Sequence, residues 1–154
     1  MEIQRSNYFE GVLQLRNCPP GLISNLQGTI SRHPQISIAG VEKVRGGEDW
    51  YVTNQRVLRT LGRWLSQHYS GQMIMSRRLF TRRKLTSRDV YRVTVLFRYM
   101  PRKRGDTFTF QDSVYSITRF GPKLEARDTK TKRRRLIDYV DLPEAIWRST
   151  SSRS

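Results

Sequence analysis

Hydrophobic and polar residues alternate from Tyr8 to Arg16, which predicts a β-strand with one buried face. Pro19-Pro20 follows and suits the first turn of a helix, because that turn does not use the N–H that proline lacks. Apolar residues then recur at helical spacing from Leu22 to Ile30, and His33-Pro34 ends the pattern. The segment therefore predicts a strand followed by a helix.

Two further strands are predicted on either side of a glycine pair. Ile36 to Val44 has an extended pattern with an irregularity expected at Gly40, and Trp50 to Val52 forms the returning strand. Gly46-Gly47 lies between them and is typical of a hairpin turn. We expect an antiparallel pair here.

A second amphipathic helix covers Val57 to Leu65, with Thr53 or Asn54 as its cap. Met73 to Met75 begins another extended stretch, and the clearest alternation in the chain follows from Tyr91 to Tyr99. The predicted order is β-α-β-β-α-β-β. We therefore expect an α+β sandwich, with helices packed on one sheet, over residues 1–99.

The pattern changes at Met100 to Asp106, a basic run between proline and glycine that suits a connector. Short alternating runs separated by turns follow, with no long helical pattern: Thr107 to Phe110, Val114 to Phe120, Leu124 to Arg127 and Arg134 to Tyr139. Such spacing predicts a second domain at 100–154, a small SH3-like β-barrel. The Ser/Arg tail from Ser149 to Ser154 is expected to be flexible.

Charge then narrows the possible functions. The chain has 29 Lys and Arg against 13 Asp and Glu, a formal charge of +16, which favours a polyanionic partner. No apolar run approaches the roughly 20 residues that a membrane-spanning helix needs. The first residues do not resemble a secretory signal, and a single cysteine, Cys18, cannot form an internal disulfide. We expect a soluble, cytoplasmic protein without a membrane partner.

Basic residues concentrate in two clusters, which we predict to bind RNA. Eleven lie between Arg77 and Arg104 against one acidic residue, Asp89, and arginine's planar fork grips phosphate oxygens well. The alternatives are a solvated surface for the first cluster and a blunted strand edge for the second. The predicted RNA-binding residues are Arg77, Arg78, Arg82, Arg83, Lys84, Arg88, Arg92, Arg98, Arg102, Lys103 and Arg104 in the first cluster, and Lys130, Lys132, Arg133, Arg134 and Arg135 in the second.

Aromatic residues near these clusters favour packing over base stacking. Tyr91 and Tyr99 share the strand face of Val93 and Val95, and Trp64 shares a helix face with Leu61. We therefore expect recognition of RNA by its shape and phosphates.

Catalytic and metal-binding patterns are weak. His33 and His68 are not accompanied by a nucleophile or carboxylate motif, and they are not spaced with Cys18 as zinc ligands are. We expect no enzyme activity, cofactor, metal or small-molecule substrate. An RNA-processing enzyme or its RNA-binding subunit remains the alternative, and an adaptor that binds acidic proteins or DNA is a third possibility.

Three segments resemble the archaeal branch of the NMD-named large-ribosomal-subunit export adaptor family: Tyr8 to Arg16, Gly46 to Tyr51, and above all Leu79 to Arg98. The resemblance covers roughly residues 6–140. It implies an α/β domain similar to a ribosomal protein, then a small β-barrel similar to a translation factor. It also implies binding at the interface side of the large ribosomal subunit, to ribosomal RNA and ribosomal proteins.

Members of this family begin with a zinc-binding module rich in C-x-x-C pairs, to which nothing in this sequence corresponds. Functions that depend on that module are therefore not expected of these residues. What the resemblance implies is a role in stabilising, monitoring or silencing the large subunit during its biogenesis.

Overall fold

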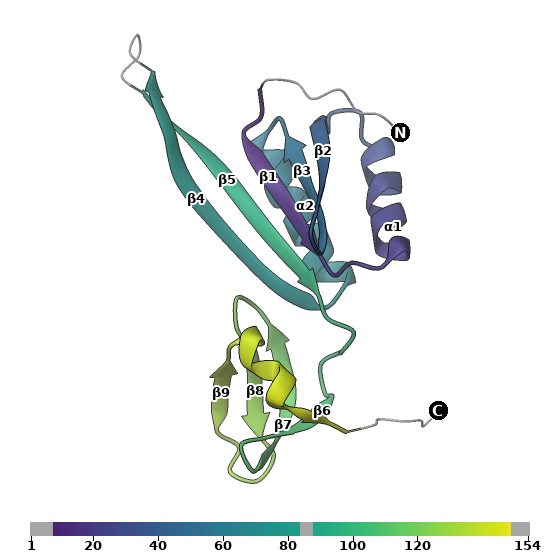
Figure 1. Cartoon of the computed structure of the whole chain (residues 1–154), viewed down its shortest axis with the longest axis vertical. Coiled ribbons are helices and arrows are strands. Elements are labelled where there is room, and N and C mark those ends of the chain that lie inside the picture. Colours follow the sequence, from purple (N-terminus) through teal and green to yellow (C-terminus); the bar gives the residue numbers. More distant parts are fainter. Residues whose placement is uncertain (1–7, 84–87, 149–154) are drawn as a thin grey trace. The chain divides into compact units, whose positions relative to one another are not determined.

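The computed structural model describes residues 8–83 and 88–148, which form two compact units (Figure 1). The first unit holds the described residues up to Tyr69 together with Met73–Tyr99, and the second holds Ser70–Gln72 and the described residues from Met100 onward. The fold is mixed α+β with two β-sheets, as the sequence predicts. Each unit is described by itself below.

A five-stranded sheet with two helices makes up the first unit. The strands are arranged in the order β2-β3-β1-β5-β4, with β1 antiparallel to β3 and parallel to β5. In chain order the elements are β1 (Gly11–Arg16), α1 (Pro20–Ser31), β2 (Ile38–Val44), β3 (Gly47–Val52), α2 (Gln55–His68), β4 (Gly71–Arg83) and β5 (Arg88–Tyr99).

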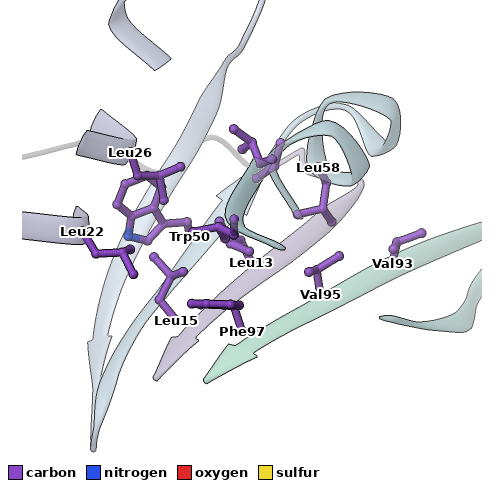
Figure 2. Packing of buried hydrophobic residues seen from close by; sticks show 12 residues of the cluster. Leu13, Leu15, Leu22, Leu26, Trp50, Leu58, Val93, Val95 and Phe97 are labelled. Atoms are coloured by element: carbon purple, nitrogen blue, oxygen red, sulfur yellow. The ribbon is translucent and has the colours of Figure 1, made fainter. Parts of the chain in front are cut away.

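Both helices pack on one face of this sheet, and the core lies between them and the strands (Figure 2). Alternate residues of β1 and β5 point inward, as the period of two predicts. Burying each such side chain stabilises the fold by about 1.5–3 kcal/mol. The labelled core residues are Leu13, Leu15, Leu22, Leu26, Trp50, Leu58, Val93, Val95 and Phe97.

Local signals in the sequence explain where α2 begins and where β2 bends. The Asn54 side chain accepts hydrogen bonds from the backbone N–H groups of Arg56 (2.8 Å) and Val57 (3.2 Å), so the cap is Asn54 and not Thr53. The pairing of β2 with β3 shifts between Ile38 and Gly40, where the sequence predicts an irregularity.

The basic segment that leads into β5 is largely a strand. β4 continues to Arg83, beyond the short extended stretch expected at Met73 to Met75. Figure 1 shows β4 and β5 running in opposite directions and continuing as a two-stranded ribbon beyond Gly11, the first residue of β1. Hydrogen bonding to a neighbouring strand gives this charged segment an extended structure that its own pattern of residues does not reveal.

The second unit contains one five-stranded antiparallel sheet with the order β10-β6-β7-β8-β9. Phe108, Ile117 and Leu124 lie at its core. Leu142, in the 3-10 helix η1, packs against them. The elements are β6 (Thr107–Phe110), β7 (Ser113–Phe120), β8 (Leu124–Asp128), β9 (Arg134–Ile137), η1 (Tyr139–Glu144) and β10 (Ile146–Trp147).

The strands described here do not close into the predicted barrel. β9 and β10 stand at opposite edges of the sheet and do not pair with each other. β10 spans two residues and β9 four, so little backbone is available for a closing ladder. A 3-10 helix, η1, follows β9 at Tyr139–Glu144.

Over the residues described, none of the helices combines the length and the apolar character that crossing a membrane requires.

Candidate nucleic-acid interface

The first candidate surface is the β4–β5 ribbon, which we define as Arg77–Arg83 with Arg88–Arg92. Arg77 and Arg78 are exposed on β4, and the Arg77 guanidinium lies 4.2 Å from the ring centre of Tyr91 on β5. Because neighbouring residues of a strand point to opposite faces, Arg77 and Arg78 present positive charge on both faces of the ribbon. Such an element can contact phosphates on two sides of a crevice in folded RNA.

Four predicted residues of this cluster lie at or beyond the bounds of β4 and β5. Arg82 and Arg83 lie at the end of β4, and Arg88 lies at the start of β5. Lys84 falls outside the described residues. Their assignment to RNA binding stays a prediction.

Arg92 and Arg98 occupy different environments on β5. The Arg92 guanidinium lies 3.8 Å from the ring centre of Phe9, and its Nε donates a hydrogen bond of 3.3 Å to the Phe9 carbonyl. This half-buried arginine therefore holds the segment before β1 against the sheet. Arg98 is exposed and pairs in register with Arg16 of β1, whose guanidinium lies 2.8 Å from Asp49.

The connector carries two exposed basic residues on an ordered turn. Lys103 and Arg104 are exposed, whereas Asp106 is 8% exposed and accepts a hydrogen bond of 3.0 Å from the Lys103 N–H. Arg102 is half-buried, with its guanidinium 4.4 Å from the ring centre of Trp147. Asp106 thus fixes the backbone that presents Lys103 and Arg104.

The second candidate surface is the basic turn, Asp128–Arg134, between β8 and β9. The Asp128 carboxylate accepts hydrogen bonds from the N–H groups of Lys130 (2.8 Å) and Thr131 (3.1 Å), which lower the pKa of this carboxyl. Lys132 adopts φ of 66° and donates its N–H to the Asp128 carbonyl. These contacts hold the exposed side chains of Lys130, Lys132 and Arg133 on a defined backbone.

Arg134 and Arg135 follow this turn on β9 and differ in their exposure and in their contacts. Arg134 is exposed, and its guanidinium lies 3.7 Å from the Glu125 carboxylate. Arg135 is half-buried and donates hydrogen bonds to Tyr115 Oη (3.0 Å) and Gln111 Oε1 (2.7 Å). Arg135 therefore braces the sheet of the second unit.

A third group of cations lies on α2, outside the two clusters predicted from the sequence. Arg56, Arg59 and Arg63 are exposed on α2, at spacings of three and four residues that place them along one side of the helix. The helix contains no acidic residue. Arginines at helical spacing without an acidic residue among them are a signal in the sequence that could have identified these residues as part of a basic surface.

Ion pairs between described residues include Arg16 with Asp49, Lys123 with Asp138 and Arg134 with Glu125. Arg77, Arg78, Lys130, Lys132 and Arg133 are exposed and belong to none of these three pairs.

The expected packing of aromatic residues holds for most of them. Trp50 is buried, and Trp64 and Tyr99 pack against the core of the first unit. Tyr91 is the exception, because it lies on the ribbon beneath Arg77, half-exposed and outside the core. The strand alternation continues beyond the helices that cover the sheet.

The structure defines the surroundings of Cys18 and His68. Burial raises the pKa of the Cys18 thiol to about 11, which disfavours the reactive thiolate. His68 is fixed by a 2.8 Å hydrogen bond between its Nδ1 and the Trp64 carbonyl. Residues 8–83 and 88–148 contain no group of three or more His, Cys, Asp or Glu side chains placed to hold a metal ion.

Comparison with known proteins adds no assignment: no protein-family model matches the chain, and no curated protein is significantly similar to it.

Proposed function

We propose that this protein is a non-catalytic, cytoplasmic RNA-binding protein that docks on large-subunit ribosomal RNA in the biogenesis, monitoring or silencing of that subunit. The observation that supports it most is the exposure of Arg77, Arg78, Lys130, Lys132 and Arg133 on backbones held by strand pairing and turn hydrogen bonds. A backbone that is already ordered loses little further conformational entropy when its side chains bind phosphates, so these segments favour a fixed RNA shape over a flexible strand.

The ribosomal assignment rests on the resemblance to the archaeal export adaptor family. That resemblance is strongest at Leu79 to Arg98, which includes most of the ribbon. The proposal also includes an SH3-like fold for the second unit. It is supported by five antiparallel strands, with β10 returning to pair beside β6.

Cosedimentation with isolated large and small ribosomal subunits, at increasing salt, tests the proposal. We expect binding to large subunits, with affinity that falls as salt rises. Two variants probe the surfaces: Arg77→Ser with Arg78→Ser, and Lys132→Ser with Arg133→Ser. Each lost phosphate contact should flatten the log-log slope by roughly 0.7–0.9.

A matched control removes the same charge from another exposed site. Lys43 and Arg45 are exposed at the β2–β3 hairpin, so Lys43→Ser with Arg45→Ser changes net charge equally without touching ribbon or turn. Equal losses in the control and the two test variants would show that only overall charge matters. Cleavage of labelled ribosomal RNA with magnesium or manganese would instead favour the alternative of an RNA-processing enzyme.

A further inference from the structure

A hollow of about 310 Å³ lies between α1 and the end of α2, and its lining includes no residue of the ribbon or the basic turn. Its volume is at the lower end of the range found for ligand pockets, which is roughly 300–1,000 Å³. The residues that line it come from one face of each helix: Ser24, Asn25, Gly28, Thr29 and Arg32 from α1 and its C-cap, and Trp64, His68 and Tyr69 from α2 and its C-cap.

The wall formed by α1 is polar but uncharged. No residue of Pro20–Ser31 carries a charge, although the chain has 29 basic residues. A Cβ added at Gly28 would have only the Arg32 guanidinium within 4 Å, at 3.7 Å, so this part of the wall is flat and open. Such a surface suits a neutral planar group with polar edges better than a phosphate.

The opposite wall is aromatic, and its rings are fixed by mutual contacts. Trp64 and His68 stack with ring centres 4.6 Å apart, and Tyr69 lies 5.9 Å from Trp64. Asn25 Nδ2 donates a 2.6 Å hydrogen bond to Tyr69 Oη across the hollow, which ties the two walls together. Fixed aromatic rings offer a stacking surface whose side-chain entropy has already been lost.

Arg32 supplies the one guanidinium of the lining. Its Nη2 donates a 3.5 Å hydrogen bond to Thr29 Oγ1, which holds the group beside Gly28 and leaves further N–H donors on the fork. The hollow thus combines aromatic rings, uncharged hydrogen-bonding groups and one cation. Proteins bind nucleotides with the same three kinds of group: aromatic rings stack on the base, uncharged polar groups hydrogen-bond to the base edge, and a cation contacts the phosphate.

We propose that this hollow binds a single unpaired nucleotide of RNA, with the base against the Trp64, His68 and Tyr69 wall and its phosphate at Arg32. This inference rests on the proposed function and adds to it. The ribbon and the basic turn bind phosphates without regard to sequence, whereas the hollow selects RNA that presents an extruded base. Base stacking on aromatic side chains changes affinity by about 5- to 150-fold per base.

Two RNA hairpins of equal length test it, one fully paired and one with a single bulged nucleotide, made with each of the four bases. Their affinities are measured by fluorescence anisotropy at fixed salt. We expect the protein to prefer at least one bulged hairpin by about 5- to 150-fold. Free mononucleotides are titrated in parallel, and the Trp64 indole signal is followed by NMR.

Gly28→Leu is the decisive variant, because it fills the hollow while improving helix propensity. Gly21→Leu is its matched control: it lies on the same helix, has nothing within 4 Å of an added Cβ, and is not part of the lining. Gly28→Leu should abolish the preference for the bulge and leave affinity for the paired hairpin unchanged. Gly21→Leu should keep the preference.

The outcomes separate this inference from the proposed function. Binding of both hairpins with equal affinity overturns the hollow's role and leaves the RNA-binding function standing, as does a preference that Gly28→Leu retains. If neither hairpin binds, the proposed function fails and, with it, RNA as the source of the nucleotide. Mononucleotide binding that Gly28→Leu abolishes, without any preference for the bulge, would assign the hollow to free nucleotides and also overturn the proposal.

Discussion

The close approach of β1 to α2 at Gly11 provides a sharp test of the core. A Cβ at this position would overlap Leu58 Cδ2 and lie 2.7 Å from the Val93 carbonyl oxygen. The leucine end can move, but the carbonyl belongs to the β5 backbone, which pairs with β1 in register. We therefore expect Gly11→Ala to lower the free energy of unfolding by about 1–3 kcal/mol, as overpacked cores do.

Leu58→Ala separates the two clashes. Leu58 is fully buried, so its truncation alone should cost about 2–5 kcal/mol. In the double variant the overlap with Leu58 disappears while the contact with the Val93 carbonyl remains. The combined loss should therefore be smaller than the sum of the single losses, by about 0.5–3 kcal/mol.

Urea unfolding followed by tryptophan fluorescence measures these losses. A Trp147→Phe background leaves Trp50 and Trp64 as the fluorophores, and both pack in the first unit. Each 1 kcal/mol corresponds to a shift of about 4–8 °C in the melting temperature of a domain near this size. Strictly additive losses, or a Gly11→Ala variant as stable as its parent, would refute the packing described at this contact.

Asn54→Ala should lower the stability of the first unit by about 1 kcal/mol because α2 loses its cap, and Asn54→Asp should not; thermal unfolding measures both. Cys18 should react with iodoacetamide at pH 8 about 10-fold more slowly than a thiol of pKa 9.0, because its pKa is raised to about 11 and the smaller thiolate fraction outweighs the higher nucleophilicity; equal rates would contradict the burial. Asp128→Ala should increase amide exchange at Lys130 and Thr131. Since the folded pKa of the Asp128 carboxyl is lowered, the protection in the parent should be present above the unfolded pKa and disappear as pH falls through the folded pKa.

Period-two alternation in the sequence was enough to find β1 and most of β5, because their inner residues are buried under helices. The same rule failed for Tyr91, since the alternation extends past those helices onto the ribbon. Barrel closure could not be predicted from short strands alone. It depends on which edge strands pair, and β9 and β10 do not.

The candidate surfaces were predicted as stretches of basic sequence, and the structure divides their members by environment. Arg92, Arg102 and Arg135 lie over aromatic rings and brace the fold, a role that depends on partners distant in sequence, such as Phe9 for Arg92. The hollow lined by Asn25 and Trp64 was missed for the same reason. Its two walls lie on different helices, and no motif in the sequence brings them together.

The parallel pairing of β1 with β5 sets an order of events during synthesis of the chain. β1 is the central strand of its sheet and already lies beside β3, but its other edge stays open until Val93 to Arg98 have been made. Contacts between such distant segments form slowly, because a long loop must close first. β5 also forms one side of the ribbon. The strand that completes the core is therefore also the strand that completes the basic ribbon. A nascent chain can form its proposed RNA-binding ribbon only when its first unit is ready to fold.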